Sequence, residues 1–257
     1  QGYPEPMKIT VLGASGNFGA DVADVLEGRG HTVVRASRST GVDAVAGKGL
    51  ARALDGSDAV VDALHITTMG ARKAVPFFSR AASNTTTAAY EQGVSRIVCL
   101  SIAGAEDPRV NSGYGYYKGK AVQESIYQQS PVPSVTVRST QWFDFVPATM
   151  GMVSRGPVAL APTMLMAPAL REEVAEFVAD AATASHEARH EILAVRGPEA
   201  DTIANFARRI LTAGGDLGGQ RPTTIKEVPY LGRGIANGGL IPQDAFVTST
   251  RFEEWLG

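Results

Sequence analysis

Short apolar runs alternate with segments of helical periodicity along the first 138 residues. Runs rich in branched residues are typical of buried strands, and they lie at 8–12, 31–36, 59–64, 96–101 and 134–138. Helices are expected between them, near 18–28, 49–54, 75–92 and 116–129. Strands that alternate with helices form a parallel sheet covered on both faces, because each connection places a helix against the sheet. The sequence therefore predicts a doubly wound α/β fold.

After residue 138 the alternation weakens and prolines become frequent. Helices are still expected at 171–184 and 202–213, and strands at 191–195 and 224–228. We therefore expect one domain over 7–257, in which 7–138 form the core and 139–257 mainly form a smaller C-terminal lobe. Residues 1–6 are expected to lie outside the natural chain, with Met7 as its start.

The composition limits the classes of partner. With 44% hydrophobic residues among 257, the chain can close a sizeable core. It carries 24 Lys and Arg against 26 Asp and Glu, so no basic field favours nucleic acid or an anionic membrane as a partner. The single cysteine, Cys99, excludes an internal disulfide and a multi-cysteine metal site. Neither a membrane span nor a secretory leader is expected, so a cytoplasmic location is predicted.

A glycine-rich turn follows the first predicted strand. Gly13, Gly16 and Gly19 stand at intervals of three, where a doubly wound (Rossmann) sheet receives the pyrophosphate of a dinucleotide. The first glycine permits a tight turn, the second lets the backbone approach the phosphate, and the third allows close helix packing. Backbone N–H groups and the positive helix end would hold the anion. Phosphate contacts are expected from Gly13, Ser15, Gly16, Asn17 and Phe18; the alternative is a turn without a ligand.

The end of the second strand selects between the two nicotinamide cofactors. An acidic residue there would accept hydrogen bonds from the ribose of NAD, but none is present. Instead the segment offers two guanidiniums and two hydroxyls, those of Arg35, Ser37, Arg38 and Ser39. These groups can donate to a 2′-phosphate, so NADP(H) is the predicted cofactor; the alternative is that the arginines are only solvated.

Side chains that could take part in catalysis lie at the end of the strand at 96–101 and in the helix after it. Ser101 stands at its carboxyl edge, and the helix beyond contains two Tyr-x-x-x-Lys pairs, Tyr114 with Lys118 and Tyr116 with Lys120. One helical turn places each pair on one face. A tyrosine hydroxyl can give a proton to the oxygen that becomes negative as hydride reaches a carbonyl carbon, and a serine hydroxyl can polarise that oxygen. Lowering a tyrosine pKa from about 10 to about 7 requires about 4 kcal/mol, and a nearby lysine ammonium supplies stabilisation of that sign.

The glycine spacing, Ser101 and the Tyr-x-x-x-Lys pairs resemble the short-chain dehydrogenase/reductase superfamily. More narrowly, the chain resembles its atypical, NmrA-like NAD(P)H-binding members over nearly all of 7–257. The resemblance implies a pair extended by a glutamate, and only Tyr116, Lys120 and Glu124 have that spacing. Lys120 would then also hold the cofactor ribose. The interval from Ser101 leaves the other pair open, and Tyr116 as a packing residue remains an alternative.

Further positions follow from the same resemblance. Leu64 and His65 are expected to line the cofactor, and Gln141, Trp142 and Phe143 to border the substrate. An aromatic-lined pocket suits a flat or apolar carbonyl compound, although both aromatic residues could equally belong to the core.

The expected function is therefore NADPH-dependent reduction of a carbonyl or quinone-like small molecule. A regulatory protein that senses NADP(H) without turnover and an isomerase or epimerase that retains its cofactor are the alternatives. The expected partner is a small-molecule substrate, a homodimer stays open, and no nucleic acid or membrane is expected to bind.

One sequence motif matches a class of enzyme other than a nicotinamide-dependent reductase. His186 to His190 read H-E-x-x-H, the signature of zinc proteases, which requires one helix through both histidines. A strand-like run begins immediately afterwards at 191, so a turn is expected here and no metal is predicted.

Overall fold

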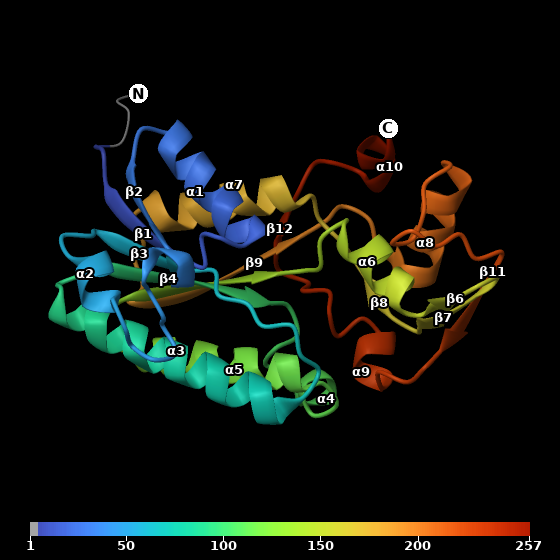
Figure 1. Ribbon diagram of the computed structural model, residues 1–257, viewed down its shortest axis with the longest axis horizontal. Coiled ribbons are helices and arrows are strands. Elements are labelled where there is room, and N and C mark those ends of the chain that lie inside the picture. Colours follow the sequence, from blue (N-terminus) through green and yellow to red (C-terminus); the bar gives the residue numbers. More distant parts are fainter. Residues whose placement is uncertain (1–4) are drawn as a thin grey trace. The chain divides into compact units, whose positions relative to one another are not determined.

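The computed structural model describes residues 5–257, and these fold as two compact units (Figure 1). The first unit comprises 5–101, 115–138 and 174–193. The second comprises 102–114, 139–173 and 194–257. Within the described residues, no helix is long and apolar enough to cross a membrane.

A seven-stranded sheet has the order β12-β9-β5-β4-β3-β1-β2. Its strands are β1 (Lys8–Leu12), β2 (Thr32–Ala36), β3 (Ala59–Asp62), β4 (Arg96–Ile102), β5 (Ser134–Ser139), β9 (His190–Arg196) and β12 (Phe246–Val247). The described registers are parallel; for example, Ile9 of β1 pairs with Val33 of β2 and with Ala59 of β3. The prediction of a doubly wound parallel sheet is confirmed.

Helices cover both faces of the first unit's sheet. They are α1 (Asn17–Gly28), α2 (Leu50–Leu54), α3 (Ala71–Glu91), α5 (Gly115–Gln128) and α7 (Arg171–Thr183). Figure 1 shows α1 and α7 on one face and α3 and α5 on the other. The strands are buried on both sides, as the branched apolar runs predict; Ile9 and Val11 are fully buried.

Glycines allow α5 to approach α3 closely. A Cβ on Gly119 would lie 2.9 Å from the Cβ of Ala74 and 2.8 Å from the ring of Phe78. A Cβ on Gly115, one turn earlier, would lie 2.6 Å from the Cα of Ala71. The face of α5 that contains Gly115 and Gly119 is therefore fixed against α3. The side chains at 116 and 120 lie on the adjacent face of the same helix.

Two small sheets and five helices form most of the second unit. One sheet has the order β11-β7-β6 and the other pairs β10 with β8. Their bounds are β6 (Ser154–Arg155), β7 (Val158–Pro162), β8 (Leu165–Met166), β10 (Asp201–Thr202) and β11 (Thr224–Val228). The helices are α4 (Pro108–Asn111), α6 (Phe145–Met152), α8 (Ile203–Thr212), α9 (Arg233–Ala236) and α10 (Phe252–Leu256). Phe206 and Phe252 pack with ring centroids 4.7 Å apart in its core.

Candidate functional site

The order of the strands reverses between β1 and β3, because β2 lies on the far side of β1. Ligands of open parallel sheets bind at the carboxyl ends of the strands beside such a reversal. Gly13 follows β1 directly with φ of 80°, and a Cβ on it would lie 2.9 Å from the carbonyl oxygen of Ala63, just after β3. The glycine-rich turn and the segment after β3 therefore meet at the reversal point.

Gly16 and Gly19 of the turn differ in whether packing within the protein requires a glycine. A Cβ on Gly19 would overlap the carbonyl group of Gly13, so only glycine lets α1 start this close to β1. A Cβ on Gly16 would have its nearest neighbour, the Gly13 oxygen, at an ordinary 3.4 Å. Packing within the protein therefore does not require glycine at 16, whereas the close approach of a phosphate does.

The start of α1 offers hydrogen-bond donors to an anion. Gly16 is the N-cap in extended conformation, with no side-chain cap. The backbone N–H groups of Ser15 and Asn17 have no hydrogen-bond acceptor among residues 5–257. These N–H groups lie at a helix N-terminus, beside Gly16, where a side chain would block the approach of a phosphate. This arrangement fits the pyrophosphate of a dinucleotide.

The two arginines expected at the 2′-phosphate differ in their surroundings. The guanidinium of Arg35 donates to Asp24 and to Glu27 of α1, the latter at 2.8 Å, and these carboxylates raise its pKa. Arg38 lies in a 3-10 turn (Arg38–Thr40), is exposed, and makes no ion pair with residues 5–257. Beside it, the hydroxyls of Ser37 and Ser39 lie 2.7 Å apart. Arg38 thus has the more available guanidinium.

Ser101 lies at the carboxyl end of β4 and is buried. Its hydroxyl donates to the carboxylate of Glu124 on α5. Arg138 of β5 donates to the same carboxylate, with Nη2 2.7 Å from Oε2. The sequence predicted Ser101 as a hydrogen-bond donor to the substrate but did not predict this ion pair, whose members come from a helix and a strand.

Lys120 is 2% exposed, and its ammonium is enclosed by hydrogen-bond acceptors and an aromatic ring. Its Nζ donates to the carbonyl oxygen of Leu100 and to Oε1 of Gln123, both at 2.6 Å. The same atom lies 4.5 Å from the centroid of the Phe78 ring. Burial lowers the pKa of Lys120, while nearby acidic groups oppose this shift.

A buried carboxylate continues this network. Asp62, the last residue of β3, accepts hydrogen bonds from Gln123 Nε2 at 2.7 Å and from the Tyr127 hydroxyl at 2.6 Å. Its other oxygen accepts from the backbone N–H of Leu64 at 3.0 Å. That turn ends β3 at 62, two residues before the predicted end at 64, and places His65 beyond the strand.

Tyr116 and His65 are brought together at this edge. The phenol oxygen of Tyr116 lies 3.1 Å from Nδ1 of His65, whose Nε2 lies 3.4 Å from the hydroxyl of Thr67. Partial burial and the charge of Lys120 lower the pKa of His65. In the alternative pair, burial raises the pKa of Tyr114, and Lys118 is exposed. The hydrogen bond between positions 65 and 116 was not predicted from sequence.

The residues expected at the substrate lie in the second unit. Phe143 is 2% exposed and packs edge-on against Phe252, with ring centroids 5.1 Å apart. Trp142 Nε1 donates to Ser139 Oγ at 3.1 Å, and the carbonyl oxygen of Gln141 accepts from the N–H of Ala169. The Phe143 side chain therefore contributes to the core of this unit.

The histidines of the H-E-x-x-H motif do not share a helix. His186 precedes β9; its Nε2–H donates to the carbonyl oxygen of Ala181, and its Nδ1 contacts the carboxylate of Glu191. His190 begins the strand, and its Nδ1 lies 2.9 Å from Ser134 Oγ. The expected strand after the motif is confirmed. Residues 5–257 contain no group of three or more His, Cys, Asp or Glu side chains placed to hold a metal ion.

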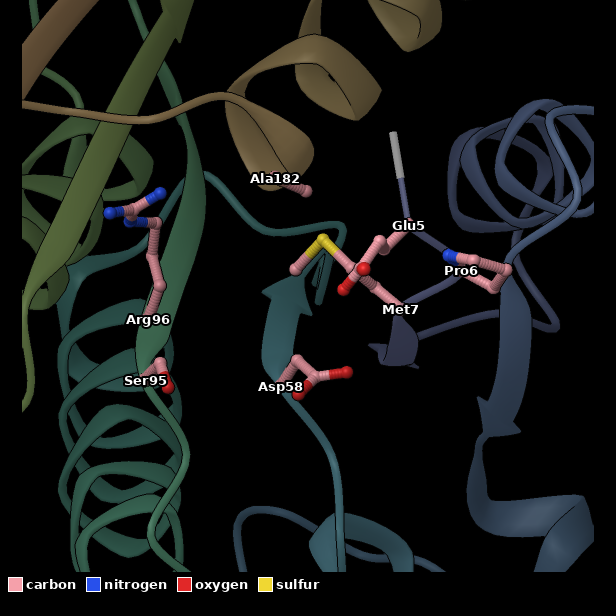
Figure 2. Close-up of a pocket in the computed structure, with 7 residues that line it drawn as sticks. All are labelled: Glu5, Pro6, Met7, Asp58, Ser95, Arg96 and Ala182. Atoms are coloured by element: carbon pink, nitrogen blue, oxygen red, sulfur yellow. The ribbon is translucent and has the colours of Figure 1, made fainter. Parts of the chain in front are cut away.

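A cavity of about 280 Å³ lies at the opposite edge of the first unit's sheet (Figure 2). It is lined by the segments that precede β1, β3 and β4, together with Ala182 of α7. Met7, Asp58 and Arg96 are among its lining residues. Since these residues stand at the amino ends of the strands, the cavity is separate from the turn at Gly13.

Comparisons with known proteins agree with this geometry. The sequence model of a family described as NAD(P)H-binding matches residues 13–185, which include the glycine-rich turn, Tyr116 and Lys120. No curated protein matched the sequence.

Solved structures share the fold at low sequence identity. A nucleoside-diphosphate-sugar epimerase from Staphylococcus aureus is 15% identical, with 97% of this chain and 99% of that one covered and a TM-score of 0.68. An NADPH-dependent quinone oxidoreductase from Escherichia coli, solved with NADPH, is 17% identical over 96% and 98%, with a TM-score of 0.65. A Bordetella bronchiseptica enzyme solved with NAD⁺ is 16% identical over 88% and 87%, with a TM-score of 0.68.

Proposed function

The chain belongs to the NAD(P)H-binding family, and we propose that it is an NADPH-dependent oxidoreductase that reduces a carbonyl or quinone-like small molecule. The observation that carries the proposal is the open position at Gly16, beside backbone donors and within one unit with Tyr116. Carbonyl reduction requires a hydride donor, which is the bound dinucleotide, and a proton donor. The first unit would supply both.

Residues of the first unit would hold the cofactor. The N–H groups of Ser15, Asn17 and their neighbours would bind the pyrophosphate at the start of α1. The exposed guanidinium of Arg38 would bind the 2′-phosphate, which favours NADPH over NADH. The segment after β3, with Leu64 and His65, would line the nicotinamide side.

Tyr116 would give the proton. When bound, NADPH supplies the hydride, and the substrate oxygen that becomes negative takes the proton of the Tyr116 hydroxyl. Lys120 lies one helical turn after Tyr116, and its positive charge favours the phenolate that remains. The Ser101 hydroxyl donates its proton to Glu124, so it could donate to the substrate only if that hydrogen bond were broken. We therefore assign Ser101 to positioning α5 against β4. Residues 139–257 would mainly shape the substrate pocket, and the substrate is the proposed partner.

Two measurements test this function. Calorimetric titration should give tighter binding of NADPH than of NADH, and equal or inverted affinities would remove the assigned cofactor preference. NADPH oxidation should then be followed with a panel of quinones, aldehydes and ketones. Turnover with one class supports an oxidoreductase; tight binding with no turnover favours a nucleotide sensor. Conversion of a nucleotide sugar without net NADPH oxidation would favour an epimerase.

A further inference from the structure

His65 stands beside the hydroxyl that donates the proton in the proposed function. It follows β3 by three residues, whereas Tyr116 lies in the first turn of α5, 51 positions later. The close packing of Gly115 and Gly119 on α3 fixes the helix that carries Tyr116. The hydrogen bond between Asp62 and the N–H of Leu64 fixes the turn that carries His65. Both partners are thus held by buried structure, and their 3.1 Å separation is a product of the fold.

The hydroxyl of Thr67 can set the direction of the hydrogen bond between His65 and Tyr116. A neutral imidazole has one N–H and one acceptor nitrogen. If Thr67 donates to Nε2, the ring proton lies on Nδ1 and points at the oxygen of Tyr116. The phenol oxygen then accepts from His65, and the phenol's own proton is directed elsewhere, as donation to a substrate requires.

Lys120 and His65 differ in their access to solvent. The ammonium of Lys120 is 2% exposed and commits two of its three donors to Leu100 and Gln123. The residue His65 is exposed, so its ring can exchange protons with water. Among the groups at this edge, His65 therefore combines contact with Tyr116 and contact with bulk solvent.

We propose that His65 restores the proton of Tyr116 after each reduction, an inference that rests on the proposed function. Hydride transfer forms a C–H bond on the substrate and oxidises NADPH to NADP⁺, while the O–H bond of Tyr116 breaks and the substrate oxygen gains the proton. A hydronium ion from solvent then protonates Nε2 of His65 and leaves as water, and the Nδ1 proton passes to the phenolate. The neutral ring returns to its starting tautomer by exchange with solvent.

The ionisation of His65 is consistent with this role. Partial burial and the charge of Lys120 lower its pKa from the usual value of 6.5, so the ring is neutral at neutral pH and carries one proton between turnovers. Tyr116 and Lys120 are the titratable groups of α5 that act on it. The phenolate formed during reduction would favour the transient second proton, because opposite charges at this distance attract.

Substitutions separate proton transfer from simple orientation. In His65→Asn an amide nitrogen replaces Nδ1 as a donor to Tyr116, but the side chain cannot pass a proton. We expect kcat to fall at least about tenfold, with the NADPH dissociation constant changed less than about twofold. Imidazole added to His65→Ala should restore turnover. Unchanged kcat in His65→Asn would overturn the relay, and His190→Asn, the same change away from Tyr116, is the matched control with full activity.

The direction of the hydrogen bond can be measured without turnover. His31 is an internal reference, because its Nδ1 accepts from the N–H of Met7 at 3.1 Å and its neutral ring must carry the proton on Nε2. Nitrogen-15 NMR at neutral pH should show His65 as the opposite, Nδ1–H tautomer, with its signal assigned by the His65→Asn variant. If no substrate is reduced, the proposed function fails, while this spectrum still decides the arrangement at Tyr116. A signal of the Nε2–H form for His65 would overturn the inference.

Discussion

A Cβ placed on Gly19 would lie 2.7 Å from the carbonyl carbon of Gly13 and closer still to its oxygen. Backbone atoms at that distance cannot yield without moving the end of β1 or the start of α1. Gly19→Ala should therefore lower the free energy of unfolding by about 1–3 kcal/mol, the usual cost of overpacking. Urea denaturation measures this change. Gly28→Ala in the same helix is the control: no atom lies within 4 Å, and stability should rise slightly.

Gly16→Ala should separate ligand binding from folding. The added methyl group makes only ordinary contacts within the protein, so stability should fall by less than about 1 kcal/mol, as expected for this exchange at an N-cap. The same methyl group occupies the approach of the phosphate, and we expect NADPH affinity to fall at least about tenfold in a calorimetric titration. Wild-type affinity in this variant would show that the pyrophosphate does not contact position 16.

Arg38 and Arg35 should differ in their effect on cofactor choice. Loss of a charge-assisted hydrogen bond costs about 1.5–3 kcal/mol, so Arg38→Ala should weaken NADPH binding by about 10-fold or more. NADH, which lacks the phosphate, should bind as before. Arg35→Ala should have less than about a threefold effect on either cofactor, because that guanidinium is already paired with Asp24 and Glu27. Equal losses for both cofactors in Arg38→Ala would contradict the assignment.

Two tyrosines provide a matched pair for the proton donor. Tyr116→Phe removes only the hydroxyl, and turnover should fall by about 10²-fold while NADPH binding remains nearly intact. Tyr114→Phe, one position from α5, should retain most of its turnover. Steady-state kinetics on both variants checks the assignment, and the reverse result would transfer the role to Tyr114.

The stability that depends on Lys120 should increase with pH. Its folded pKa is lowered by burial from the usual 10.5, so between that lower value and 10.5 the unfolded chain binds more protons than the folded one. Stability attributable to this side chain therefore rises with pH across that interval. The difference in unfolding free energy between wild type and Lys120→Met should shift in favour of wild type on going from neutral to alkaline solution.

The central sheet could be predicted because burial on both faces leaves a direct record in the sequence. Lys8–Leu12 has the same bounds in the prediction and in the structure, and Arg96–Ile102 extends the predicted strand at 96–101 by one residue. The short elements of the second unit left no such record. Strands of two residues, such as Ser154–Arg155, and the helix Phe145–Met152 with its internal proline arise from tertiary contacts rather than from local periodicity.

The candidate site was predictable where the backbone itself imposes the residue type. Gly13 and Gly19 are required by a positive φ and by a close approach, and both requirements appear as glycines at fixed spacing. Side-chain partnerships carry no comparable signal. The contact of His65 with Tyr116 joins positions 51 apart, and the pair of Glu124 and Arg138 depends on how a helix settles on a strand. Such pairings follow from packing and could not be deduced from one sequence.

Cys99 lies in the middle of β4, fully buried, and burial raises the pKa of its thiol. As the chain has one cysteine, its outer surface offers no reactive sulfur to alkylating reagents. A cysteine introduced at an exposed position such as Lys118 would consequently be labelled alone. One substitution, such as Lys118→Cys, is thus enough to attach a single fluorophore or spin label for following cofactor binding, and Cys99 need not be replaced first.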